Sequence, residues 1–424
     1  MKYIYPTLLE TGNSINTNSW FNIKEHKNFS YNKKKKKRIK VSYIDTIKIK
    51  LKLTKLQKEI ILIWLDDCIN IYNMCNQYLK SKLTNDNYKK ELNFIKIRKE
   101  LNSEIKKICN INKLNKHTGD YAVKHCIEMY KSAFSNHKDI SKFELKDLDK
   151  SRRRKNLVIE PASVSKKINS IFVTYLKEIK SSLPLNIISQ NSILQYDSYK
   201  KTFIIISPKE VIDEKELEQF NKCGIDIGVR TFLTTYSKNG CYEIGTNTNK
   251  IIDRLNKRFD NINKSKTENK ITKNKFNKLN NKYHDRLENL IKDMHNKTAN
   301  FLLKKYETII IGKVSIKKMV SNLTNTLQDV VKRRLIALSH YRFRMKLKQM
   351  ATKFETTIIE TNEYLTSKCC SNCETIKDSL GSNKIYECDK CKLIIDRDIN
   401  ASINIYKNRI LTRSNPLKTV DNTL

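Results

Sequence analysis

Two pairs of cysteines constrain the fold of this chain more than any other feature of its sequence. Each pair has the spacing Cys-x2-Cys, and fourteen residues separate one pair from the other. The pairs are Cys370 with Cys373 and Cys388 with Cys391. Two such turns can close a tetrahedral thiolate site around Zn²⁺, in which the protein takes all four ligand positions. The spacing therefore predicts a zinc ribbon over residues 366–392, with a structural metal that supplies much of its folding energy.

The remaining cysteines indicate a reducing compartment. The chain has 11 cysteines, an odd number, and six of them are scattered singly among apolar neighbours. Cys369 lies beside a ligand but out of register with the set. This distribution is unlike the disulfide framework of a secreted protein. Because the sequence also lacks an apolar run of the roughly 18 residues that a membrane span needs, we expect an intracellular protein without a membrane partner.

The charge of the chain predicts the class of its partner. Its 424 residues include 84 Lys and Arg against 44 Asp and Glu, which gives a net charge of +40. Gly and Pro together number only 13, which indicates the codon bias of an AT-rich genome, so part of the lysine excess is mutational. A charge this large nonetheless binds polyanions by counterion release.

The N-terminal half has the pattern of a small β unit that a helical lobe interrupts. A polar, aperiodic beginning is expected to be disordered, and it ends in the basic run 33–38. That run is either a solvated segment or a nuclear-localisation or nucleic-acid patch. Alternation of period two predicts strands, and helical spacing after the N-cap residue Thr54 predicts helices. The expected boundaries are 1–42 for the basic segment, 43–53 and 141–220 for the β unit, and 54–140 for the helical lobe.

The C-terminal half has the element order of an RNase H-like sheet with helices on both faces. Three short strands are expected first, with Asn239-Gly240 as a hairpin turn between the second and third. Helical and strand patterns then alternate. The expected strands are 224–229, 231–236, 241–245, 308–312 and 356–361, and the expected helical stretches are 251–306, 329–354 and 396–405. We therefore predict a multidomain α/β protein whose RNase H-like domain spans 221–365 and 393–412 and is followed by a tail over 413–424.

Two acids in this half can carry chemistry. Asp226 lies inside an apolar strand, where a charge is costly unless it is paired or bound to a metal. A nearby amide or arginine could also satisfy it. Asp398 is expected in the first turn of the last helix, where compensation of the helix N-terminus is a sufficient structural reason for an acid.

Four motifs together resemble a known family. They are Gly-Ile-Asp-Ile-Gly-Val-Arg at 224–230, Leu-Ser-His-Tyr-Arg-Phe-Arg at 338–344, Glu363-Tyr-Leu-Thr-Ser running into the first cysteine pair, and Asp-Arg-Asp-Ile-Asn-Ala at 396–401 after the second pair. In this order they resemble the RuvC-like nuclease and zinc-ribbon region of transposon-encoded TnpB proteins and their eukaryotic and viral relatives, the Fanzor nucleases. The resemblance covers roughly residues 221 to 408, and the N-terminal half matches only in layout.

The resemblance implies an RNA-guided DNA endonuclease encoded by a transposon-like element. Carboxylates would bind two Mg²⁺ ions, a guide RNA would read the target by base pairing, and the protein would read a short flanking motif in double-stranded DNA. We expect a monomer that acts in the nucleus or at another intracellular site of DNA replication. The β unit would be a wedge-like barrel and the helical lobe would lie along the guide–target duplex. The basic turn of Arg152, Arg153, Arg154 and Lys155 would contact phosphates, unless it is merely a solvated loop.

One position departs from the TnpB pattern. TnpB proteins have a catalytic Glu at the end of the strand 308–312, where this chain has Gly312. Fanzor-type sequences share that loss and offer a Glu just before the zinc ribbon, which here is Glu363. A Glu at the end of the neighbouring strand can reach the same metal because adjacent strands lie about 4.8 Å apart. Glu363 is therefore the predicted partner of Asp226 and Asp398, and Glu360 on the same strand is the competing candidate.

Two other functions remain open. Loss of the Glu at Gly312 would also fit a catalytically decayed protein that still binds guide RNA or DNA. A transposase that joins strands is disfavoured, because we find no tyrosine- or serine-recombinase signature.

Overall fold

The computed structural model describes most of the chain and divides it into two compact units. The described residues are 21–26, 34–83, 88–135, 145–313, 316, 320, 327–361, 365–377, 381, 383–407, 409–410 and 418–419. Unit 1 combines Met1–Tyr43 with Ile212–Leu424, and unit 2 is Ile44–Val211. None of the described helices is long and apolar enough to cross a membrane.

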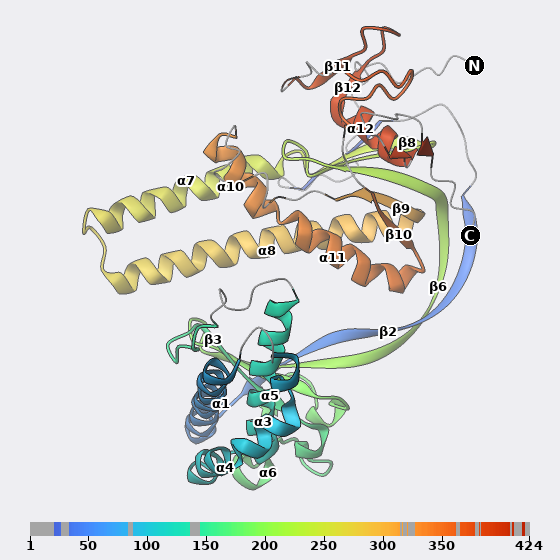
Figure 1. The fold of residues 1–424 in the computed structure, drawn as a ribbon. Helices are drawn as coiled ribbons and strands as arrows, with labels where there is room; N and C mark the ends of the chain where they lie inside the picture. The colour runs from blue at the N-terminus through green and yellow to red at the C-terminus, as the bar shows by residue number, and fades with distance from the viewer. Residues whose placement is uncertain are drawn as a thin grey trace. The chain divides into compact units, whose positions relative to one another are not determined.

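A mixed six-stranded sheet forms the centre of unit 1 (Figure 1). The strands are β1 (Ile23–His26), β8 (Gly240–Ile244), β7 (Leu233–Ser237), the last part of β6 (Thr202–Ile227), β9 (Tyr306–Gly312) and β10 (Thr357–Thr361), in that spatial order. Pairs from β1 to β6 are antiparallel, whereas β6, β9 and β10 run parallel. The tight turn between β7 and β8 pairs Ser237 with Gly240, as the Asn-Gly signal predicts.

Helices cover both faces of this sheet. They are α7 (Thr248–Thr267), α8 (Lys273–Lys305), α10 (Asp329–Leu338), α11 (His340–Ala351) and α12 (Arg397–Tyr406). Side chains alternate between the faces of a strand, so Ile225 of β6 and Ile311 of β9 join α8 and α11 in one apolar core. Helix α12 packs on β7 and β9. The predicted mixed α/β architecture is confirmed.

Gly224 sets the close approach of α12 to β6. A Cβ atom at this position would lie 2.3 Å from the backbone nitrogen of Tyr406 and 2.5 Å from the carbonyl oxygen of Ser402. Only glycine leaves room for that contact. Asp226 follows two residues later, so it lies on the same face of β6 and points toward the α12 side.

Two small hairpins complete unit 1. Strands β11 (Ile385–Glu387) and β12 (Ile394–Asp396) pair within the cysteine-rich segment, and β13 (Arg409–Ile410) pairs with β14 (Lys418–Thr419).

Unit 2 packs helices against an open sheet. Its strands follow the order β3 (Arg154–Ile159), β5 (Ser192–Asp197), the first part of β6, the last part of β2 (Lys35–Lys52) and β4 (Lys180–Ser181). Its helices are α1 (Lys55–Lys82), α2 (Tyr88–Glu91), α3 (Phe94–Glu100), α4 (Asn102–Ile111), α5 (Lys116–Phe134) and α6 (Val173–Leu176). Thr54 forms the predicted N-cap of α1, in a capping box with Gln57.

Two expectations for the N-terminal half differ from the structure. The β unit is not a closed barrel, because its edge strands β3 and β4 do not pair with each other among the described residues. Strand β2 also begins at Lys35, inside the segment expected to be disordered. Glu216 and Glu218 of the neighbouring strand β6 form ion pairs with Arg38 at 2.5 Å and Lys36 at 3.5 Å, and Ile39 of β2 is buried in the core of unit 1.

Candidate functional site

Asp226 and Asp398 line one cavity of about 390 Å³ in unit 1. Asp226 comes from the end of β6, and Asp398 comes from the first turn of α12. The close packing at Gly224 brings these two elements together. The structure thus gathers two of the three predicted carboxylates around the same space. The third, Glu363, lies outside the described residues.

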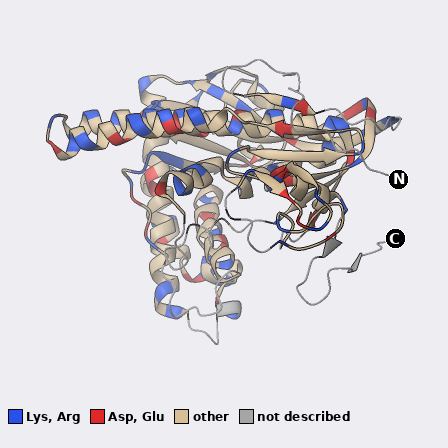
Figure 2. Ribbon diagram, turned by 90° about the horizontal axis from the view of Figure 1, so that it is seen from above, with Lys and Arg blue, Asp and Glu red and all other residues tan. Residues whose placement is uncertain are grey.

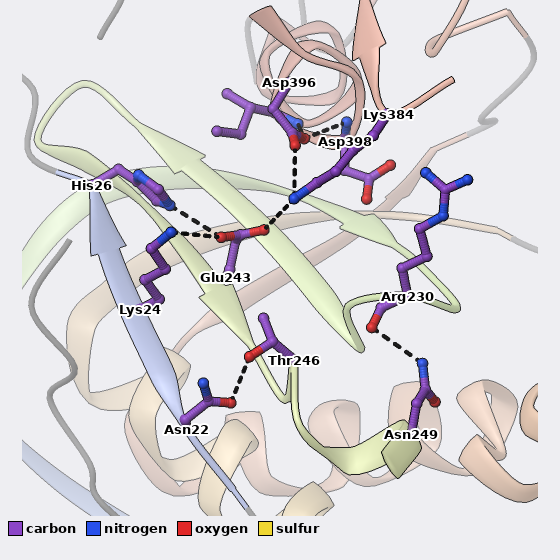
Figure 3. Close-up of polar contacts among 11 residues, drawn as sticks. Asn22, Lys24, His26, Arg230, Glu243, Thr246, Asn249, Lys384, Asp396 and Asp398 are labelled. Carbon is purple, nitrogen blue, oxygen red and sulfur yellow. Dashed lines mark hydrogen bonds and ion pairs between the residues drawn. The ribbon is translucent and has the colours of Figure 1, made fainter. Parts of the chain in front are cut away.

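The N-terminus of α12 holds Asp398 in place. Asp396 caps the helix, and its carboxylate accepts hydrogen bonds from the backbone N–H groups of Asp398 at 2.9 Å and Ile399 at 3.2 Å. Burial raises the pKa of Asp398, and the nearby Asp396 raises it further, against the opposing charges of Arg397, Arg230 and Lys384. A carboxylate that is costly to ionise in this way is stabilised by a bound cation. Figure 3 shows Asp398 beside the side chain of Arg230.

Glu360 lies on the other face of the sheet. It is paired with Ile311, whose side chain belongs to the core under α8 and α11. Its carboxylate forms ion pairs with Lys348 of α11 at 3.0 Å and with Lys313 at 3.6 Å. Burial would raise its pKa, but the hydrogen bond and charge of Lys348 hold the pKa of Glu360 below its ordinary value. Glu360 therefore faces away from the side on which Asp226 lies.

Gly312 ends β9, where the TnpB pattern has a Glu. It pairs with Thr361, the last residue of β10. Neither residue offers a carboxylate, so the two acids of the cavity have no third carboxylate from the described ends of β9 and β10.

Sequence reasoning missed several residues of the cavity wall. Arg230, His340, Thr366 and Arg397 line it, and in the sequence each of them stands out only as part of one of the four family motifs. His340 is completely buried and stacks on Phe232 at a centroid distance of 5.2 Å. Burial lowers the pKa of His340 to about 3, so the ring is neutral at physiological pH. The strand spacing around Asp226 does not reveal His340 or Thr366, because both are more than 100 residues away in the sequence.

The four predicted cysteines form a compact thiol cluster. Their sulfur atoms all lie within 4.8 Å of one another. Cys370 Sγ is 3.6 Å from Cys391 Sγ, and Cys373 Sγ is 3.4 Å from Cys388 Sγ. A tetrahedral zinc site with Zn–S bonds of about 2.3 Å requires sulfur separations of about 3.8 Å. The donor set therefore fits zinc.

The two cysteine turns share one backbone conformation. Glu374 and Lys392, each four residues after the first cysteine of its pair, are left-handed with φ of 70° and 57°. Their N–H groups each donate to the carbonyl of that first cysteine at 3.0 Å. Cys369 is outside the thiol cluster, as predicted from its register, and is fully buried.

Two buried asparagines fasten the first cysteine turn to α12. Asn400 donates to the carbonyl of Cys369 at 2.7 Å and accepts from the N–H of Ser371 at 2.9 Å. Asn404 donates to the carbonyls of Cys369 and Thr366, both at 2.8 Å. The helix that carries Asp398 is thus bonded directly to the segment that carries the thiols.

A second polar connection joins the ribbon to the sheet. Lys384 lies 3.5 Å from Asp396 and 3.9 Å from Glu243 of β8 (Figure 3). Glu243 is buried and also contacts His26 of β1 at 3.1 Å. The hydrogen bond with His26 holds the pKa of Glu243 below its ordinary value. Lys384 thus connects Asp396, the cap residue of α12, to Glu243 of β8, and Glu243 in turn contacts the edge strand β1.

Three of the four basic side chains predicted to contact phosphates in unit 2 form ion pairs with acids. Asp197 forms ion pairs with Arg153 at 3.1 Å and with Arg154 at 3.8 Å. Lys155 forms an ion pair with Asp66 at 2.5 Å. Arg152 lines a separate cavity of about 310 Å³ in unit 2.

Comparison with known proteins identifies the family. The chain is 35% identical to "TnpB-like protein L770" of Acanthamoeba polyphaga mimivirus, over 95% of this chain and 85% of that protein. It is 37% identical to "TnpB-like protein R854" of the same virus, over 89% of this chain and 74% of that protein. The chain belongs to the TnpB-like proteins.

Two family models match parts of this TnpB-like chain. The family described as "Probable transposase" matches residues 203–323, and the family described as "Cas12f1-like, TNB domain" matches residues 340–405. Among solved structures, the chain is similar to the protein in a Cas12f1-sgRNA-target DNA complex, with a TM-score of 0.46 and 14% identity over 83% of each chain.

Proposed function

We propose that this TnpB-like protein is an RNA-guided, Mg²⁺-dependent DNA endonuclease. The observation that carries the proposal is the convergence of Asp226 and Asp398 on one cavity from elements far apart in the sequence. Mg²⁺ prefers oxygen ligands, and carboxylates at such a site bind it well. When bound, two such ions would activate water and stabilise the leaving oxygen of the phosphodiester.

We assign unit 1 to the RNase H-like, RuvC-type fold. The strand order β8-β7-β6-β9-β10, with two antiparallel pairs followed by two parallel pairs, supports this assignment. Helices on both faces support it as well.

We assign Glu363 as the third carboxylate. Side chains along β10 point alternately to the two faces of the sheet. Thr361 pairs with Gly312 and lies on the face that α12 covers. Glu363 follows Thr361 by two residues in the sequence, so its place in the chain suits the same side. The opposite orientation of Glu360, whose carboxylate pairs with Lys348 and Lys313, supports the choice of Glu363.

The thiol cluster would hold a structural Zn²⁺. Cys370, Cys373, Cys388 and Cys391 would be its ligands, and the bound metal would fix the fold of the ribbon. Asn400 and Asn404 would transmit that order to α12.

Guide RNA and double-stranded DNA with a short flanking motif are the proposed partners. The net charge of +40 suits both polyanions, and membership of the TnpB-like family favours guided recognition. We propose that the protein acts as a monomer, inside the cell, where the DNA is replicated.

A cleavage assay on the purified ribonucleoprotein tests the function. RNA that copurifies from the native locus is sequenced, and a plasmid with the complementary target is incubated with the complex and Mg²⁺. We expect guided, metal-dependent cutting that is lost in Asp226→Ala. Equal cutting by Asp226→Ala would refute the site, whereas tight binding without any product would support a decayed binding protein instead.

A further inference from the structure

Helix α7 carries a stripe of basic residues that the candidate site does not use. Lys250, Arg254, Lys257 and Lys264 are exposed and recur at intervals of four, three and seven residues. This spacing places them on one face of the helix. The stripe extends for about 21 Å at 1.5 Å per residue. We call these four residues the α7 stripe.

The acids of α7 do not neutralise this stripe. Asp253 forms an ion pair with Arg334 of α10, and Asp260 forms a two-bonded pair with Arg333 at 2.8 and 3.0 Å. Both acids therefore form ion pairs with arginines of α10 and not with the stripe. Among the described residues, Lys250, Arg254 and Lys257 have no ion-pair partner, and only Lys264 has a weak one, Glu268 at 3.8 Å.

None of the four stripe residues is among the buried residues of α7. The buried residues of α7 are confined to its first half and end at Asn256. Beyond that point the helix runs past the core of unit 1, beside α8 (Figure 1). Basic positions recur along these projecting helices (Figure 2). Like charges on one helix face repel each other. A bound anion would reduce the repulsion among the four cations of the stripe.

One end of the stripe lies next to the candidate metal cavity. Asn249, the residue before Lys250, donates from its side-chain amide to the carbonyl of Val229 and to that of Arg230. Figure 3 shows the second of these bonds. Both of the accepting residues line the cavity that holds Asp226 and Asp398. A chain of phosphates lying on the stripe would therefore lead from the outside of unit 1 to the two carboxylates.

We propose that the α7 stripe binds the phosphate backbone of the DNA strand that enters the cavity to be cut. This assignment rests on the proposed nuclease function. It goes beyond that function because it names the path of one strand. Contacts to phosphates carry no sequence information, which suits a protein whose guide reads the sequence.

The test compares two variants with the same loss of charge. The stripe variant is Lys250→Gln, Arg254→Gln, Lys257→Gln and Lys264→Gln. The control variant is Lys35→Gln, Lys36→Gln, Arg38→Gln and Lys40→Gln, whose side chains are exposed on β2 and already paired with acids. Binding of a single-stranded DNA oligonucleotide of arbitrary sequence to the full ribonucleoprotein is measured over a range of salt, with Ca²⁺ in place of Mg²⁺.

We expect the slope of log affinity against log salt to fall in magnitude by about 3 for the stripe variant, since each phosphate contact on a single strand contributes about 0.7. The control variant should keep the parental slope. Equal slopes for the two variants would overturn the proposal. This binding readout needs no cleavage, so it also separates the stripe from a failure of the nuclease function.

Crosslinking identifies the strand. DNA with a photoreactive group on single phosphates near the cut should label the peptide that spans 250–264, and the label should be lost in the stripe variant. Labelling of this peptide by the copurified RNA, and not by the DNA, would assign the stripe to the guide and refute the DNA path.

Discussion

Asp398 and Asp226 reach the same cavity only because of contacts made by other residues. The cap by Asp396 fixes the first turn of α12, and the missing side chain at Gly224 fixes the distance of that helix from β6. The chemistry of the site thus depends on atoms that take no part in it.

Glu363 and Glu360 provide a matched pair of substitutions at the residue scale. Glu363→Gln should lower guided cleavage more than about a hundredfold, because even partners outside the ligand set of a metal cost 10 to 100-fold when removed. Glu360→Gln should cut at close to the parental rate, since its carboxylate faces Lys348 and Lys313 on the other face of the sheet. Single-turnover cleavage of a matched target measures both. Loss of cutting in Glu360→Gln alone would reverse our assignment.

Asn400 offers a test of how the ribbon is attached. Asn400→Ala would leave the carbonyl of Cys369 with one donor fewer and the N–H of Ser371 without its acceptor, both in a buried place. We expect a loss of about 1–3 kcal/mol in the free energy of unfolding, measured by denaturant titration. Zinc content should stay unchanged, because the thiols are intact. An exposed asparagine such as Asn274→Ala should leave stability as it is.

At the scale of elements, the strand-to-helix contact at Gly224 determines whether the carboxylates meet. Gly224→Ala would place a methyl group 2.3 Å from the backbone of Tyr406, and backbone cannot rotate away as a side chain does. We expect α12 to shift, cleavage to be largely lost, and stability to fall by about 1–3 kcal/mol. Gly381→Asn is the control, because a Cβ there meets nothing within 4 Å and Asn tolerates its positive φ. Full activity in Gly224→Ala would show that the contact does not position Asp398.

The sequence predicts elements with local signals and misses features that depend on pairing. The hairpin at Asn239-Gly240, the cap at Thr54 and the four cysteines follow from local chemistry, and the structure has all of them. The direction of Glu360 could not be predicted, because it depends on the register of β10 against β9. The attachment by Asn400 was equally hidden, since its partners lie 29 and 31 residues away in the chain.

The basic run of the N-terminal half also takes its structure from pairing with a distant segment. A run of lysines and arginines predicts a solvated segment when read alone. Here alternating acids on β6 pair with alternating cations on β2, and the segment becomes a strand. Acids likewise pair with Arg153, just before β3, and with Arg154 and Lys155, its first two residues. Only the placement of each cation relative to its acids distinguishes a binding surface from a paired one.

In the molecule as a whole, we expect the cysteine-rich ribbon and its proposed zinc to link the fold to catalysis. It is inserted between Glu363 and the helix of Asp398, and its first turn is bonded to that helix through Asn400 and Asn404. Catalytic groups must be held within about 0.5 Å of their working geometry. Loss of the metal should therefore disorder the turn, release α12 and separate the carboxylates.

Cys388→Ser or Cys373→Ser should accordingly abolish cleavage about as fully as Asp398→Ala, although neither thiol touches the candidate metal cavity. Cys369→Ser is the matched control. It lies outside the thiol cluster, and a serine hydroxyl can keep the hydrogen bond that the Cys369 thiol makes to the carbonyl of Glu374. Metal analysis should find about one zinc per chain in the parent and in Cys369→Ser, and much less in the other two. A zinc-free preparation that cuts at the parental rate would show that the ribbon does not position the site.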